Sequence, residues 1–186
     1  GLFDVRRFAV DLRRLDRLRQ EEGEESESRD AHVVRGMKNF GFRDLRLVQP
    51  REYDAYRVEG IAHQTADVLA RVRTFESLGE AIADCVHVVG LTARGRTAKR
   101  NLQRQREAAA EITALAEDGP VALLFGREDK GLTNDALDRC HRVVTIPTEP
   151  SYASLNLGHA AIVMLYELAL ARGAEALPFK APRRAA

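Results

Sequence analysis

Three loop-like segments, each directly after a short apolar run, carry the residues best suited to chemistry. They are residues 91–96 (LTARGR), 126–133 (GREDKGLT) and 147–156 (PTEPSYASLN). Glycine, proline and small hydroxyl residues let a main chain turn sharply and approach a ligand closely. If the apolar runs are parallel strands, their carboxyl ends meet at one edge of a sheet, where ligands bind. We therefore expect the three segments to form one binding site.

The second of these segments is close to a nucleotide-phosphate loop but lacks its cation. Gly126 and Gly131 have the spacing of that motif, and Thr133 stands where the magnesium-binding hydroxyl belongs, but Leu132 occupies the lysine position. Without the lysine, nucleotide phosphates lose their charge partner, so NTP hydrolysis is disfavoured. The sequence contains neither G-x-G-x-x-G nor G-x-S-x-G, which argues against a classical dinucleotide site and against a serine hydrolase.

Two thiol–imidazole pairs, Cys85-x-His87 and Cys140-His141, are weak candidates for a metal site. Neither pair has the C-x-x-C or H-E-x-x-H spacing that metal sites use, so we predict no metal and interpret these side chains as core or rim residues. Alternation along a strand would point Cys140 and His141 to opposite faces. Two cysteines make no disulfide framework, and reduced thiols indicate a cytoplasmic protein.

Charge is nearly balanced overall but is concentrated locally. The chain has 29 Lys and Arg against 28 Asp and Glu, a net charge of +1, which excludes a uniformly basic nucleic-acid binder. Residues 94–106 (RGRTAKRNLQRQR) carry positive charges only. This block is either a solvated helix face or a surface that contacts phosphates. In the second case the candidate RNA-binding residues are Arg94, Arg96, Lys99 and Arg100.

The elements that must position these segments alternate between strand and helix. Short runs rich in Val, Leu and Ile predict buried strands at 45–48, 86–91, 121–125 and 142–146. A capping box at Ser77 and Glu80 opens a helix to about residue 84, strong helix formers fill 102–117, and Ser154 can cap a helix that runs to about residue 171. The alternation predicts an α/β domain with a mostly parallel sheet. With 186 residues, the chain is about one domain in length, and it has no apolar run long enough to span a membrane.

The amino-terminal part of the chain has a different character. Leu12, Leu15 and Leu18 indicate a short amphipathic helix, and the acidic run Glu21–Glu27 is typical of a solvated linker or disorder. We therefore expect no sheet strand here and a segment that is mobile or loosely docked as helix. The predicted organisation is a charged amino-terminal segment (1–31), a folded domain (32–174) and a basic tail (175–186).

Three motifs, in order, resemble those of the SPOUT superfamily of RNA methyltransferases. RGMKNFGFRDLRLV (35–48) is similar to the first, LLFGREDKGLTNDAL (123–137) to the second and IPTEPSYASLNLGHA (146–160) to the third, with VGLTAR (89–94) between the first two. Within the superfamily, the chain resembles the TrmH/SpoU family of RNA 2′-O-ribose methyltransferases, and most of all its TrmJ-type tRNA enzymes. The resemblance covers roughly residues 33–172.

The resemblance implies a fold, a reaction and a cofactor. The fold would be a parallel sheet flanked by helices, with a carboxy-terminal trefoil knot formed around residues 121–172. The reaction would be methyl transfer from S-adenosyl-L-methionine to a ribose 2′-hydroxyl of RNA, with tRNA favoured over rRNA, in a homodimer to which the apolar final helix could contribute. The implied cofactor-binding residues are Leu91, Thr92, Ala93, Gly126, Ile146, Ala153, Ser154 and Leu155.

The resemblance also places four residues at the reacting centre: Arg35, Glu128, Ser154 and Asn156. A guanidinium rarely gives up its proton in a protein, so binding a phosphate and stabilising a developing oxyanion suits Arg35 better than acting as a base. Glu128 would hold Arg35 or a loop amide. For Ser154, helix capping and a catalytic role are both open, and for Asn156 so are a structural and a catalytic role.

One departure from the family pattern bears on activity. The first motif normally begins with Asn-x-Gly six residues before its arginine, where this chain has Arg29, Asp30 and Ala31. Asn and Gly suit a tight turn that these residues do not easily reproduce. The alternative to an active enzyme is therefore a slow or inactive relative that binds RNA, cofactor or both.

Overall fold

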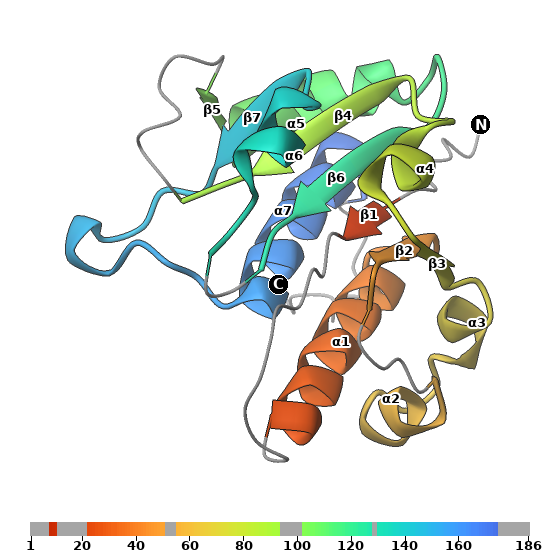
Figure 1. The fold of residues 1–186 in the computed structure, drawn as a ribbon. Coiled ribbons are helices and arrows are strands. Elements are labelled where there is room, and N and C mark those ends of the chain that lie inside the picture. Colours follow the sequence, from red (N-terminus) through yellow and green to blue (C-terminus); the bar gives the residue numbers. More distant parts are fainter. Residues whose placement is uncertain (1–7, 11–21, 51–54, 94–101, 128–129, 175–186) are drawn as a thin grey trace, which may run out of the picture.

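The computed structural model describes residues 8–10, 22–50, 55–93, 102–127 and 130–174. Within them, seven strands form one sheet in the order β3-β2-β1-β6-β4-β7-β5 (Figure 1). The strands are β1 (Phe8–Val10), β2 (Leu45–Val48), β3 (Arg73–Phe75), β4 (His87–Leu91), β5 (Leu102–Arg104), β6 (Val121–Phe125) and β7 (Arg142–Thr145). Every neighbouring pair is parallel, so the carboxyl ends of all strands share one edge. The predicted parallel α/β sheet is confirmed.

Helices cover both faces of this sheet. One face packs against α1 (Glu22–Asn39), α5 (Gln105–Leu115) and α7 (Leu157–Ala171), with α2 (Ala55–Ile61) and α3 (Ala66–Leu69) at its β2 side. The other face packs against the shorter helices α4 (Leu78–Ile82) and α6 (Asn134–Asp138). None of the helices that the structure describes is long and apolar enough to cross a membrane.

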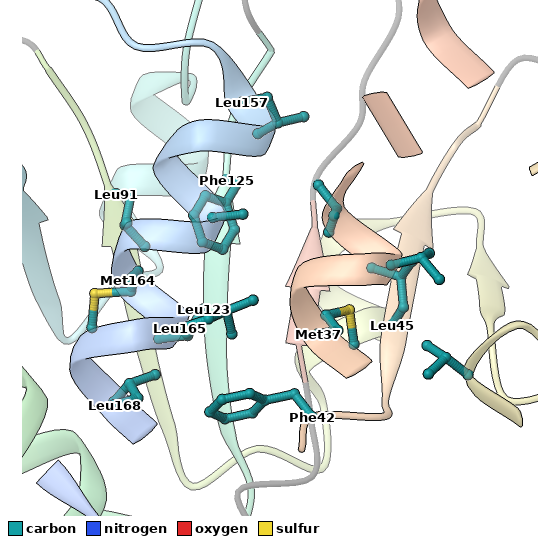
Figure 2. Close-up of a cluster of buried hydrophobic side chains, with 14 of the residues drawn as sticks. Met37, Phe42, Leu45, Leu91, Leu123, Phe125, Leu157, Met164, Leu165 and Leu168 are labelled. Atoms are coloured by element: carbon teal, nitrogen blue, oxygen red, sulfur yellow. The ribbon is translucent and has the colours of Figure 1, made fainter. Parts of the chain in front are cut away.

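Strand β6 shows why its sequence is apolar without interruption. Val121, Leu123 and Phe125 belong to the larger core cluster, and Ala122 and Leu124 belong to the cluster on the opposite face. A strand buried on both faces needs apolar side chains at every position. Figure 2 shows part of the larger cluster, where Leu157, Met164 and Leu168 follow one another along α7. Leu157 and Met164 lie near Phe125 and Leu91, and Leu168 lies at the level of Phe42.

Helices α1 and α7 run parallel and pack closely along one seam. Three contacts, one helical turn apart, form this seam. His32 and Gly36 on α1 meet Gly158 and Ile162 on α7, and Phe40, directly after α1, meets Tyr166. A Cβ on Gly36 would lie 2.8 Å from Ile162 Cγ1, so the close approach depends on glycine. This seam fixes the position of α7, whose amino-terminal end lies at the carboxyl edge of the sheet.

The elements predicted between residues 45 and 171 are largely confirmed, with two differences. Ser77 caps α4 as expected, accepting a hydrogen bond from the Glu80 amide. Helix α7, however, begins at Leu157 and is capped by Asn156, whose Oδ1 accepts from the amides of Gly158 (2.9 Å) and His159 (3.4 Å). The predicted cap Ser154 lies before it. The first residues of the predicted helix 102–117 form the edge strand β5 instead.

The amino-terminal expectation of no strand and a linker is wrong for the residues described there. Strand β1 lies in the middle of the sheet, where Phe8, Ala9 and Val10 pair with Leu45–Leu47 of β2 and Val10 also pairs with Phe125 of β6. Helix α1 begins at Glu22, inside the acidic run interpreted as a linker. A three-residue strand gives almost no periodic signal, and acidic residues are favourable in the first turn of a helix. The boundaries 32–174 remain a prediction, and the tail 175–186 lies outside the described residues.

Candidate functional site

A cavity of about 320 Å³ opens at the carboxyl ends of β4, β6 and β7. All eight residues that the sequence resemblance assigned to the cofactor line it, so the structure brings the three predicted segments together. The lining residues are Leu91, Thr92, Ala93, Phe125, Gly126, Arg127, Lys130, Gly131, Val144, Ile146, Ala153, Ser154, Leu155, Leu157 and Ala160.

The floor of the cavity is apolar and is held by the sheet. Phe125 and Val144 are buried, and Leu91 is only 8% exposed. The Thr92 amide donates to the Val144 carbonyl at 3.0 Å, which continues the β4–β7 pairing to the cavity. Strand ends fixed in this way form a rigid base with few mobile side chains, as small-molecule sites require.

Gly126 forms one wall of the cavity, where two backbone segments touch. A Cβ at this position would overlap the backbone of Gly131 and Leu132, so the second loop folds directly over Gly126. The loop is closed by the Gly131 amide, which donates to the Arg127 carbonyl at 2.6 Å, and Gly131 has φ +63°. Glycine is therefore needed at 126 for contact between two backbones, and close approach of this backbone to a ligand stays a prediction.

The third segment forms the opposite wall. Pro150–Tyr152 make one turn of 3₁₀-helix, and the Thr148 hydroxyl donates to the Ala153 carbonyl at 3.1 Å. Ala153, Ser154 and Leu155 follow and line the cavity, with Ser154 exposed and Leu155 half-buried. Because Asn156 caps α7, the Ser154 hydroxyl is not used as the helix cap.

Two cations stand at the cavity. Arg127 is half-buried and Lys130 is exposed, and both belong to the lining. Of the lining residues that the structure describes, none is acidic. The cavity is therefore suited to a ligand with apolar parts and a negatively charged group.

The other predicted site residues have different positions. Arg35 lies on α1 with an exposed side chain and is not among the lining residues, and Asn156 adjoins the cavity as the cap of α7. Glu128 and the predicted RNA-binding residues Arg94, Arg96, Lys99 and Arg100 lie outside the described residues. Sequence reasoning missed Phe125, Arg127, Lys130, Gly131, Val144, Leu157 and Ala160. Phe125 could have been predicted, because it stands at the carboxyl end of the predicted strand 121–125.

The thiol–imidazole pairs lie away from this cavity, near the amino ends of β4 and β7. Cys140 Sγ lies 3.2 Å from the Ala136 carbonyl within the smaller core cluster, whereas His141 stacks on His87 with ring centroids 4.7 Å apart. Burial lowers the pKa of His87, and the charges of His141 and Arg142 act in the same direction. Among the described residues, no three His, Cys, Asp or Glu side chains gather as a metal site would require.

The fold and the cavity define the class of protein: a parallel α/β domain whose ligand site is built from loops at the carboxyl ends of β4, β6 and β7 and from the start of α7. Residues 31–166 match the model of the SpoU rRNA Methylase family, and the chain belongs to this family.

Individual relatives agree with the family assignment. The chain is 40% identical over 139 residues to the tRNA (cytidine/uridine-2′-O-)-methyltransferase TrmJ of Yersinia pestis (strain Pestoides F), covering 75% of this chain and 54% of the relative. The chain thus spans about half the length of the curated relatives it matches. Its structure is similar to TrmJ from Z. mobilis ZM4, with a TM-score of 0.74 and 31% identity over 88% of this chain and 68% of that one. The fold is also that of the SpoU methyltransferase AviRb from Streptomyces viridochromogenes, solved in complex with AdoMet (TM-score 0.62, 19% identity, 89% of this chain and 57% of that one).

Proposed function

We propose that this chain transfers a methyl group from S-adenosyl-L-methionine to a ribose 2′-hydroxyl of RNA, with tRNA as the substrate. The observation that carries the proposal is the convergence of all eight assigned cofactor residues on one cavity. The family membership and the activity named for the relatives at 40% identity support it.

The residues of the cavity fit this cofactor. Ile146 and Leu155 offer apolar surface for an adenine ring, and the main chain of Leu91–Ala93 can satisfy its polar edge. Arg127 and Lys130 suit the carboxylate of the methionine part or a neighbouring phosphate. When bound, the cofactor supplies a methyl group on a sulfonium, which is a good leaving group. The work left to the protein is placing the 2′-hydroxyl and assisting the loss of its proton.

Four residues are proposed to do this work. Arg35 binds the phosphate next to the target ribose and stabilises the developing oxyanion, and Glu128 holds Arg35 or a loop amide. Ser154 orients the ribose from the cavity wall, because its hydroxyl is not used as a helix cap. Asn156 acts as a positioning residue, since its side chain holds the first turn of α7.

The basic block is proposed to bind the RNA backbone. Neutralising Arg94, Arg96, Lys99 and Arg100 together should weaken tRNA binding and flatten its salt dependence, because each lost phosphate contact removes roughly 0.7–0.9 from the log–log slope. Cofactor affinity should not change. An unchanged salt slope would mean that the block is only a solvated face.

We further propose a trefoil knot around residues 121–172 and a homodimer. The membership of the SpoU rRNA Methylase family supports the knot. In α7, Leu165 and Leu168 are fully buried within the chain, whereas Ile162 and Val163 are half-buried. A dimer contact through this helix would therefore involve Ile162 and Val163.

One observation favours the alternative, a slow or inactive relative that still binds RNA or cofactor. Helix α1 runs without a break from Glu22 to Asn39, so Arg29, Asp30 and Ala31 are helical where the family pattern has the residues of a tight turn. A reacting group displaced by about 1 Å can lose a hundredfold in rate. The cavity does not depend on these residues, so cofactor binding is expected in both cases.

A methylation assay on bulk tRNA tests the proposal, with the modified ribose mapped and S-adenosylhomocysteine binding measured by calorimetry. We expect stoichiometric binding, 2′-O-methylation, and loss of turnover in Arg35→Ala and Ser154→Ala. Tyr56→Ala, an exposed α2 substitution away from the cavity, is the control and should keep full activity. Binding without methylation would favour the alternative, and absence of binding would contradict both.

A further inference from the structure

Two tyrosines of the described residues are almost completely exposed, and only one of them stands beside the cavity. Tyr152 is 83% exposed and Tyr56 is 84% exposed. Tyr56 lies on α2, which contributes nothing to the cavity lining, whereas Tyr152 immediately precedes the lining residues Ala153 and Ser154. An exposed aromatic ring at the mouth of a binding site points to a role in contacting the ligand.

The backbone that carries Tyr152 is held in place. The Tyr152 amide donates to the Glu149 carbonyl at 2.9 Å, and Pro150 occupies the first position of the 3₁₀ turn. The Thr148 hydroxyl closes the turn from the other side by donating to the Ala153 carbonyl. Figure 1 shows the segment between β7 and α7 projecting from the body of the domain. The ring is therefore presented on a fixed turn, so binding to it needs little ordering of the chain.

The position of the ring fits one kind of occupant. The Cα atoms of Tyr152 and Ser154 are two residues apart, at most about 7 Å. A ribose placed at Ser154 therefore has its own base, or the adjacent one, within reach of Tyr152. Lys130 and Arg127 supply positive charge to the same cavity for the connecting phosphate. Unstacked RNA bases bind aromatic side chains irrespective of sequence, because every base has a π-face.

We propose that Tyr152 is a stacking platform for an unpaired base of the RNA substrate, at or next to the nucleotide whose ribose enters the cavity. This inference rests on the proposed function and deepens it: it specifies that the substrate is presented single-stranded at the cavity mouth. Because stacking needs a ring but no hydroxyl, phenylalanine should replace tyrosine and an aliphatic residue should not.

The test compares four substitutions in the full chain: Tyr152→Ala, Tyr152→Leu, Tyr152→Phe and the matched control Tyr56→Ala. Binding is measured with a fluorescein-labelled single-stranded heptauridylate and with bulk tRNA, methylation by its KM for tRNA, and the cofactor site by S-adenosylhomocysteine calorimetry. We expect roughly tenfold higher Kd and KM for the Ala and Leu variants. The Phe and Tyr56→Ala variants should stay within about twofold of the parent, and cofactor affinity should be unchanged in all four.

Different results would overturn different claims. If the parent chain binds and methylates tRNA but Tyr152→Ala keeps its Kd and KM, the platform is wrong and the proposed function stands. If Tyr152→Ala weakens cofactor binding as much as RNA binding, Tyr152 has only a structural role in the loop. If Leu restores binding as well as Phe, the contact is apolar and not stacking. If the parent chain binds neither the heptauridylate nor tRNA, both the stacking platform and the proposed function are wrong.

Discussion

The two edges of the sheet are built on opposite principles. At the carboxyl edge, β4, β6 and β7 end in a cavity lined by apolar and small residues and two cations. At the amino edge, polar side chains pair with one another: Asp44 with Arg73 (3.0 Å), His87 with His141, and Arg142 with Glu111. The same strands thus carry an open edge suited to binding and an amino edge, the closed edge, where charged side chains form ion pairs with one another.

The strongest contact near the closed edge involves a buried charge. The Arg46 side chain is 1% exposed and makes two hydrogen bonds to Asp84, at 2.6 and 3.1 Å, and a third to the Ala81 carbonyl. Burial acts to lower the pKa of Arg46, but the Asp84 hydrogen bond and nearby negative charges outweigh it, so the pKa lies above its ordinary value. We infer that changes at this edge alter stability, and that changes at the carboxyl edge alter binding.

The largest expected effect comes from β1, which joins the two halves of the sheet and hence both edges. Ala9→Pro removes a main-chain donor from a strand that is paired on both sides by β2 and β6. We expect a loss of more than about 3 kcal/mol in the free energy of unfolding, measured by urea denaturation. Ala9→Val, which keeps the donor and suits a strand, is the control. If Ala9→Pro unfolds like the parent chain, β1 does not hold the halves together.

Strand β1 also marks the limit of what the sequence predicts. The strands β2, β4, β6 and β7 were predicted because burial on both faces demands uninterrupted apolar runs. The place of the cavity followed from the rule that parallel strands bind ligands at their carboxyl ends, and its proposed assignment to the cofactor followed from the resemblance of three motifs. Strand β1 has only three residues between charged stretches, so no local pattern distinguishes it.

Contacts between distant segments explain the other differences. Helix α7 is capped by Asn156 and not by Ser154. Both residue types can cap a helix, and packing against α1 sets where the first turn of α7 begins and hence which of them is the cap. Gly126 lines the cavity as expected, and its contact with the backbone of Gly131 and Leu132 is a further requirement for glycine. Lys130 lines the cavity because the loop that follows Gly126 folds back over it. None of these contacts has a signal in local sequence.

The second prediction tests the open edge. Gly126→Ala places a Cβ against the Gly131–Leu132 backbone and displaces the cavity wall. We expect S-adenosylhomocysteine binding to weaken at least about a hundredfold and the free energy of unfolding to fall by about 3 kcal/mol. Gly60→Ala on α2, where a Cβ has nothing within 4 Å, should leave binding unchanged. Parent-like binding in Gly126→Ala would show that the cavity is not the cofactor site.

The third prediction concerns the closed edge alone. Asp84→Asn removes the carboxylate that makes two hydrogen bonds to the buried Arg46 and leaves it only the longer ion pair with Asp44 (3.7 Å). We expect a loss of about 2 kcal/mol in unfolding free energy with cofactor affinity unchanged. Asp135→Asn breaks an exposed ion pair with Arg139 on α6 and should cost only about 0.3 kcal/mol. Equal losses in the two variants, or weakened cofactor binding in Asp84→Asn, would contradict the division between the edges.

The smallest expected effect is a pH dependence at the same closed edge. Burial, assisted by the charges of His141 and Arg142, lowers the pKa of His87 in the folded protein. The unfolded chain therefore binds more protons, so the stability contributed by neutral His87 is fully present above about pH 6.5 and is lost as the pH falls below that value. A single proton limits the change of unfolding free energy with pH to about 1.4 kcal/mol per pH unit.

Unfolding measured between pH 7.5 and 5.5 should show a shallower acid slope for His87→Phe, which keeps a ring against His141, than for the parent chain. His63→Phe, at an exposed histidine beyond this pair, should keep the parental slope. If all three slopes coincide, His87 does not link the closed edge to acid stability.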